Sequence, residues 1–185
     1  MQREQIARSI RGALLLARFN ARGMEFLDAT VDGFWDSFFG AVLSAPIAAY
    51  WLVVGFPETT VSAGWVVAVE AVRYVVGWIM FPAIMIPIAR GLQVWPRYVP
   101  FVVAYNWSMV VQTALFFVIT VVGQTGLVPL EIDSVVYLAA VLYTIVYLTF
   151  IARTALGVSA VIGTALSLLD FALTYLLVLE SQRLL

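Results

Sequence analysis

The 185-residue chain is 63% hydrophobic and 11% charged, with a net charge of −1 at pH 7. Soluble domains are about half apolar and about a quarter charged, so this composition predicts an integral membrane protein, and the near-neutral charge offers no basic surface for nucleic acid. The sequence has no cysteine, histidine or lysine. We therefore expect no cofactor, no thiolate or imidazole metal site, and no catalysis through a histidine base or a lysine Schiff base.

The first thirty residues carry a helical pattern with two different faces. One face holds apolar side chains: Ile6, Ile10, Ala13, Leu14 and Ala17. The other face holds charged side chains: Glu4, Arg8, Arg11, Arg18, Arg22 and Glu25. We expect residues 1–30 to form an amphipathic helix in the plane of the cytoplasmic leaflet, where Arg8, Arg11, Arg18 and Arg22 contact anionic lipid headgroups. The alternative is a solvated cytoplasmic helix that packs on loops of the bundle.

Residues 31–185 are predicted to form one transmembrane domain. A membrane-spanning helix needs about 20 apolar residues. Five segments meet this requirement, at residues 34–54, 64–89, 98–122, 135–152 and 157–179. The short connection "RTAL" predicts an antiparallel hairpin of the fourth and fifth spans. The fold class is therefore all-α: a polytopic bundle of five transmembrane helices with an N-terminal interfacial helix.

The arginines predict how this bundle is oriented in the membrane. Eight of them fall on one side of the predicted spans: Arg3, Arg8, Arg11, Arg18, Arg22, Arg90, Arg97 and Arg153. Only Arg183 falls on the other side. Cytoplasmic loops carry an excess of arginine and lysine, so the N-terminus is predicted in the cytoplasm and the C-terminus in the periplasm of a bacterial inner membrane.

Two charged residues of opposite sign are predicted at the same depth in the membrane. Arg73 lies nine residues from the outer end of the second span at Gly64, and Asp170 lies nine residues from the outer end of the fifth span at Leu179. At about 1.5 Å per residue, both would sit about 13 Å below the outer face. We therefore expect a buried ion pair between them, with Glu70 sharing Arg73 from three residues earlier on the same helix face.

Uncharged polar residues are expected to support this ion pair. Ser44, Gln112 and Thr144 fall at a similar depth, and Asn106 lies deeper toward the cytoplasm. Such a layer has two interpretations, a solute or proton pathway or a satisfied bridge that fixes the helix arrangement. Small residues recur every four positions and predict close helix packing. They are Gly40, Ser44 and Ala48 in the first span and Ser159, Gly163 and Ser167 in the fifth.

The third span begins with the stretch "YVPFVVAYNWSMVV", and the second span contains "FPAIMIPIA" with two prolines. Together with five spans and a cytoplasmic N-terminus, these features resemble the bacterial Yip1-like membrane proteins. The resemblance implies a non-enzymatic protein that acts through oligomers or partners, and it transfers no catalytic residues.

These patterns favour a non-enzymatic integral membrane protein, either an accessory subunit of a membrane complex or a Yip1-like scaffold, with a protein partner or a second copy in the membrane. The alternative is a small solute transporter or proton-conducting protein that uses the Arg73–Asp170 pair. A membrane enzyme comes third, because Glu70 and Asp170 are the only acids at membrane depth that could serve as an acid–base pair.

Overall fold

The computed structural model describes residues 3–185, which form seven α-helices and two short 3₁₀-helices. In chain order the elements are α1 (Arg3–Ala17), η1 (Ala21–Phe26), α2 (Val31–Ser37), α3 (Phe39–Val54), α4 (Ala63–Gly91), η2 (Trp95–Arg97), α5 (Tyr98–Gln124), α6 (Leu130–Leu156) and α7 (Ala160–Arg183). The described residues contain no strand, so the predicted all-α fold class is confirmed.

Five helical segments are long and apolar enough to cross a membrane. They are Val31–Val54, Ala63–Gly91, Trp95–Gln124, Leu130–Leu156 and Ala160–Arg183, with mean hydropathies between 1.6 and 2.2. Each matches one of the five predicted spans, so this is a multi-pass membrane protein. The first segment is divided at Phe38, where a turn separates α2 from α3.

Local capping explains where several helices begin and end. The side chains of Thr30, Ser62 and Ser159 accept hydrogen bonds from backbone amides in the first turns of α2, α4 and α7. Such caps satisfy backbone donors that a helix leaves open at its N-terminus. At the end of α6, Gly157 adopts a left-handed conformation with φ of 73°. Side chains rarely adopt this conformation, so glycine is favoured at this turn.

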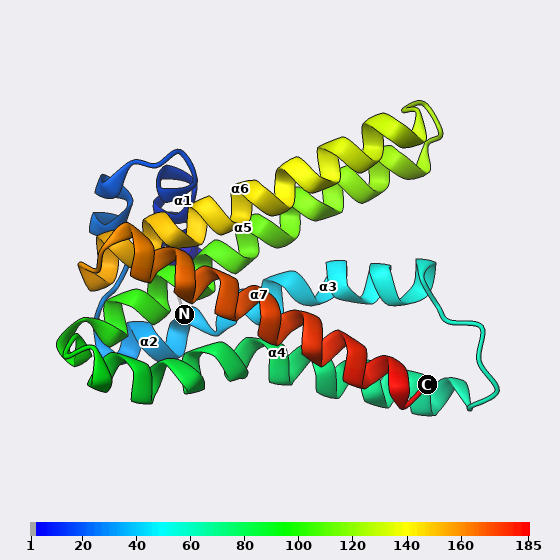
Figure 1. The fold of residues 1–185 in the computed structure, drawn as a ribbon, viewed down its shortest axis with the longest axis horizontal. Helices are drawn as coiled ribbons and strands as arrows, with labels where there is room; N and C mark the ends of the chain where they lie inside the picture. Colours follow the sequence, from blue (N-terminus) through cyan, green and yellow to red (C-terminus); the bar gives the residue numbers. More distant parts are fainter. Residues whose placement is uncertain (1–2) are drawn as a thin grey trace.

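The helices are tightly packed at one end of the bundle and diverge toward the other. Figure 1 shows α1, η1 and the α6–α7 turn at one end, which we call the α1 end. The opposite end, which we call the far end, holds the 55–62 loop, the α5–α6 turn and the C-terminus. Every residue from Phe101 to Ser108 of α5 is buried, in the half of α5 nearest the α1 end. Toward the far end, the α5–α6 hairpin projects away from α4 and α7 (Figure 1).

Helix α1 packs on the bundle through tyrosines of α6. The hydroxyl of Tyr147 donates to the carbonyl of Ala13 at 2.8 Å, and that of Tyr143 donates to Ala17 at 2.6 Å. Ala13 and Leu16 are fully buried, whereas Leu14 is 47% exposed. Leu14 is thus turned away from the bundle, and its contact with lipid stays a prediction. On another side α1 is covered by η1, which the helical pattern alone does not reveal.

The four arginines predicted at lipid headgroups, Arg8, Arg11, Arg18 and Arg22, are exposed on α1, on η1 and in the turn between them. Arg8 donates to the carbonyl of Glu25 at 2.9 Å, and the guanidinium of Arg11 lies 4.8 Å from the centre of the Phe26 ring. These contacts hold η1 against α1. Placement of this helix in a lipid leaflet remains a prediction.

The crossing of α1 and η1 depends on two glycines. A Cβ added at Gly23 would lie 2.5 Å from the carbonyl oxygen of Gly12 and 2.9 Å from the backbone nitrogen of Leu16. Both neighbours are backbone atoms, which cannot rotate away. Gly23 therefore allows η1 to fold back on α1.

We predict that Gly23→Ala destabilises the packing of α1 and η1 by about 1–3 kcal/mol, the typical effect of overpacking. The measurement is the thermal unfolding midpoint in detergent, together with the rate of proteolysis at the arginines of α1. Gly91→Ala is the matched control, because a Cβ there meets no atom within 4 Å. Equal behaviour of the two variants would contradict this account of the crossing.

Candidate functional site

A cavity of about 520 Å³ lies between the spans, in the half of the bundle nearest the far end. Helices α3, α4, α5, α6 and α7 all contribute to its lining, which mixes aromatic, apolar and polar side chains. The lining extends from Ser167 and Asp170 near the middle of α7 to Thr120 and Tyr137, which lie toward the far end of α5 and α6. This volume is in the usual range for small-molecule sites, about 300–1,000 Å³.

Asp170 lies in this lining with a single hydrogen bond. The hydroxyl of Tyr105 donates to its Oδ1 atom at 2.8 Å. Tyr105 is only 2% exposed and is fixed between other aromatic rings, with Phe81 at a centroid distance of 4.9 Å. Within residues 3–185, the Oδ2 atom of Asp170 has no protein partner in hydrogen bonding or ion pairing.

Close packing of α7 on α6 turns Asp170 toward the bundle interior. A Cβ added at Gly163 would lie 3.0 Å from the carbonyl oxygen of Thr149, and the hydroxyls of Ser167 and Thr149 are 3.0 Å apart. Two of the small residues predicted to allow close packing thus lie at this helix contact. Asp170 is three residues beyond Ser167 and shares its inward-facing side of α7.

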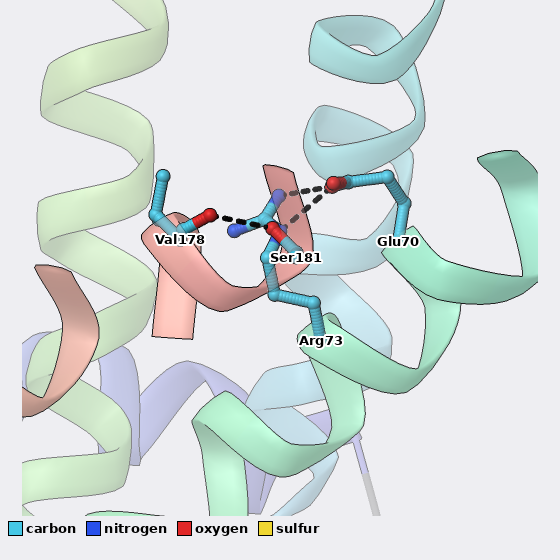
Figure 2. Close-up of polar contacts among 4 residues, drawn as sticks. All are labelled: Glu70, Arg73, Val178 and Ser181. Carbon is cyan, nitrogen blue, oxygen red and sulfur yellow. Dashed lines mark hydrogen bonds and ion pairs between the residues drawn. The ribbon is translucent and has the colours of Figure 1, made fainter. Parts of the chain in front are cut away.

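Arg73 also lines the cavity but has a different partner. Its Nε atom donates to the Oε2 atom of Glu70 at 2.7 Å, and its Nη2 atom donates to the same oxygen. Figure 2 shows both interactions beside the last turns of α7, where Ser181 donates to the carbonyl of Val178. The other salt bridge of the described residues joins Arg183 to Glu180. The predicted direct pair of Arg73 and Asp170 is therefore not formed, whereas the predicted sharing of Arg73 by Glu70 is present.

The offset between α4 and α7 explains why the predicted pair does not form. Near the far end, the indole Nε1 of Trp65 donates to the carbonyl of Leu184 at 2.9 Å, so these two residues lie at one level. Arg73 is eight residues along α4 from that level, and Asp170 is fourteen residues along α7. The difference of six residues corresponds to about 9 Å along the helix axes. Counting from a span end at Leu179 places Asp170 too close to the outer face, because α7 continues to Arg183.

The predicted polar layer separates into two groups. Gln112 and Thr144 line the cavity with Arg73 and Asp170. Glu70 binds Arg73 but is not part of the lining, and neither are Ser44 and Asn106.

Ser44 and Asn106 are almost fully buried elsewhere in the bundle. Asn106 donates through Nδ2 to the hydroxyl of Ser37 at 2.8 Å, so it joins α5 to the end of α2. Its Oδ1 atom and the hydroxyl of Ser44 have no hydrogen-bond partner in the described part of the chain. These two residues contribute to packing between α2, α3 and α5 rather than to the cavity.

Several residues in or beside the cavity were not predicted from the sequence. The most important is Tyr105, which is buried outside the lining and whose hydroxyl reaches Asp170. Its spacing to Ser108 and Gln112 is three and seven residues, which places all three on one helix face and was a usable signal. Aromatic side chains form much of the remaining lining: Trp51, Tyr74, Trp78, Phe116, Tyr137 and Phe171. Their convergence depends on how the five helices pack, so no local pattern identifies it.

We predict that Tyr105 and Asp170 are energetically coupled and that Arg73 and Asp170 are not. In double-mutant cycles, contacting residues show coupling of about 0.5–3 kcal/mol, whereas distant residues are additive within about 0.5 kcal/mol. The cycle of Tyr105→Phe with Asp170→Asn should fall in the first range, and the cycle of Arg73→Leu with Asp170→Asn in the second. Unfolding in mixed detergent micelles provides the free energies.

Arg73→Leu with Glu70→Gln supplies a positive control, since these two side chains share a salt bridge. Coupling between Arg73 and Asp170 as large as in this control would contradict the arrangement described above and restore the predicted ion pair.

Comparison with known proteins gives no match: no family model, curated protein or solved structure is similar to this chain. The resemblance to Yip1-like proteins therefore stays a prediction.

Proposed function

We propose that this chain is a non-enzymatic protein of the bacterial inner membrane that admits a small solute into the cavity beside Asp170. One observation carries the proposal: a carboxylate at membrane depth, with one neutral hydroxyl as its partner, lines a cavity of about 520 Å³. Ionisable groups inside a membrane are energetically costly, and they commonly mark substrate or ion pathways. This corresponds to the transporter alternative, with Asp170 rather than the Arg73–Asp170 pair as the central group.

The arginine distribution supports a cytoplasmic N-terminus and a periplasmic C-terminus. In this orientation the α1 end faces the cytoplasm, and the exposed arginines of α1 and η1 meet anionic headgroups of the inner leaflet. The cavity then lies in the periplasmic half of the bundle. Its solute enters from the periplasmic side and reaches Asp170 near the middle of the membrane.

Water access to the cavity tests this proposal, and the chain is well suited to the test because it has no native cysteine. Thr174 lines the cavity, whereas Leu176 is 53% exposed on the same helix and is not part of the lining. We predict that Thr174→Cys reacts with a charged, membrane-impermeant thiol reagent added to the periplasmic side. Leu176→Cys should stay unreactive, because thiols react as thiolates and a lipid-facing thiol does not ionise.

The rate of modification in intact cells and in inverted vesicles is the measurement. Equal, slow reaction at both positions would mean that lipid fills the cavity, and the proposal would fail. Fast reaction of Thr174→Cys from the cytoplasmic side alone would reverse the orientation but leave the solute cavity in place.

A scaffold or accessory role is the second candidate, favoured by the projecting α5–α6 hairpin. Near the far end this hairpin exposes large apolar side chains: Val118, Val121, Tyr137, Leu138 and Leu142. If a second copy of the chain covers this surface, Leu138→Cys should form an intermolecular disulfide in membranes under mild oxidation. Leu176→Cys serves as the control on α7, outside the hairpin. Absence of a Leu138 dimer, or equal dimerisation of both variants, would remove this candidate.

A further inference from the structure

The cavity has an uneven charge balance. Arg73 and Asp170 are the only charged side chains in its described lining. Two N–H groups of Arg73 bind one carboxylate oxygen of Glu70, so the positive charge is already neutralised by an adjacent acid. Asp170 has only the neutral hydroxyl of Tyr105. A ligand beside Asp170 therefore meets a site whose uncompensated charge is negative.

Some of the hydrogen-bonding groups that line the cavity with Asp170 present acceptors. Thr144 donates its hydroxyl proton to the carbonyl of Val141, which leaves the hydroxyl oxygen as an acceptor. Gln112 uses its amide nitrogen on Ser108 at 3.2 Å, and no hydrogen bond within residues 3–185 reaches its Oε1 atom. With the second oxygen of Asp170, these groups suit a ligand that brings several N–H donors. An ammonium group brings three such donors.

The remaining walls suit an apolar body. Six aromatic side chains line the cavity, and Trp78 and Phe171 come from the two helices, α4 and α7, that run along one side of it. Aromatic faces attract organic cations as well as apolar groups, and the attraction increases when the site excludes water. Inorganic ions would leave this large apolar surface without contacts.

The charge balance, the hydrogen-bonding groups and the aromatic walls together indicate which solute the cavity takes. The following inference rests on the proposed function and makes it more specific. We infer that the cavity binds an organic cation, namely a protonated amine whose ammonium group meets Asp170 and whose apolar part lies against the aromatic walls. Tyr105 positions the carboxylate without neutralising it. The pair of Glu70 and Arg73 adds no net charge of its own, so it does not attract an anionic ligand in place of the amine.

Three probes of similar shape separate the effect of charge: 2-phenylethylamine as the cation, 2-phenylethanol as its neutral counterpart of equal size and 3-phenylpropanoate as a slightly larger anion. Binding to the purified protein in detergent is measured by titration calorimetry and by quenching of tryptophan fluorescence. We expect the amine to bind about tenfold or more tightly than the alcohol, because both can donate to Asp170 but only the amine carries the opposite charge. The anion should bind most weakly.

Two variants test whether the preference for the amine over the alcohol depends on the carboxylate of Asp170. Asp170→Asn keeps an oxygen that can accept from Tyr105, so the fold is retained while the charge is removed. In this variant the amine and the alcohol should bind equally. Glu180→Gln is the matched control: Glu180 is on the same helix, is exposed and pairs with Arg183 outside the cavity lining. It should keep the full preference for the amine.

Each other result overturns the inference. Equal binding of amine and alcohol to the unmodified protein would mean that the cavity accepts solutes without charge selection, and the proposed function would stand. Tighter binding of the anion would show that Arg73 governs the site. If the amine fails to bind at millimolar concentration, the inference is wrong, and cysteine accessibility at Thr174 then decides separately whether the cavity is open to solutes.

Discussion

The burial of one half of α5 is the constraint on which the rest of this structure depends. All residues from Phe101 to Ser108 are buried, and this half of α5 meets α1, α2, α4 and α6 at the α1 end. Because interiors are close-packed, helices gathered around bulky side chains such as Trp107 and Tyr105 are held there at fixed positions. The other half of α5 is held mainly by α3, where Tyr50 packs edge-on against Phe117 and donates to Gln124. There the α5–α6 hairpin projects away from α4 and α7, and the cavity forms (Figure 1). A rigid half and an open half of one bundle follow from a single packed segment.

Tyrosine hydroxyls form several of the hydrogen bonds between elements inside this bundle. Tyr74, Tyr98, Tyr143 and Tyr147 each donate to a backbone carbonyl of another element, at Ala41, Pro82, Ala17 and Ala13. Hydrogen bonds between helices stabilise membrane proteins modestly, because unfolded segments also find partners in the bilayer. These four bonds fix the positions of α1, α3 and α4. Tyr105 differs from them because its partner is a carboxylate. This difference is why we consider Asp170, rather than another polar residue, to be the centre of a functional site.

The two charge pairings expected for Arg73 differ in what they depend on, one on spacing within a helix and the other on the alignment of two helices. Glu70 and Arg73 are three residues apart on one helix, so their salt bridge follows from helical spacing and was predicted. The pairing of Arg73 with Asp170 required two helices to be aligned along their axes. The contact between Trp65 and Leu184 sets that alignment, and it moves Asp170 deeper than a count from the end of the apolar run indicated. A shift of six residues changes the partner of Asp170 from a cation to a phenol, and with it the net charge of the site.

The sequence by itself determined the membrane class, the number of spans and the all-α fold, because hydrocarbon requires about 20 consecutive apolar residues with internally paired backbones. It also determined the Glu70–Arg73 salt bridge and the small residues where α7 meets α6, both of which depend on spacing within one helix. Tertiary structure alone decided which face of α1 is buried, which polar residues meet in the cavity, and which group binds Asp170. The physical reason is that apolar transmembrane helices carry little directional information. Their axial offsets and rotations are set by side chains of several helices packing at once, and these positions decide which buried polar groups find partners.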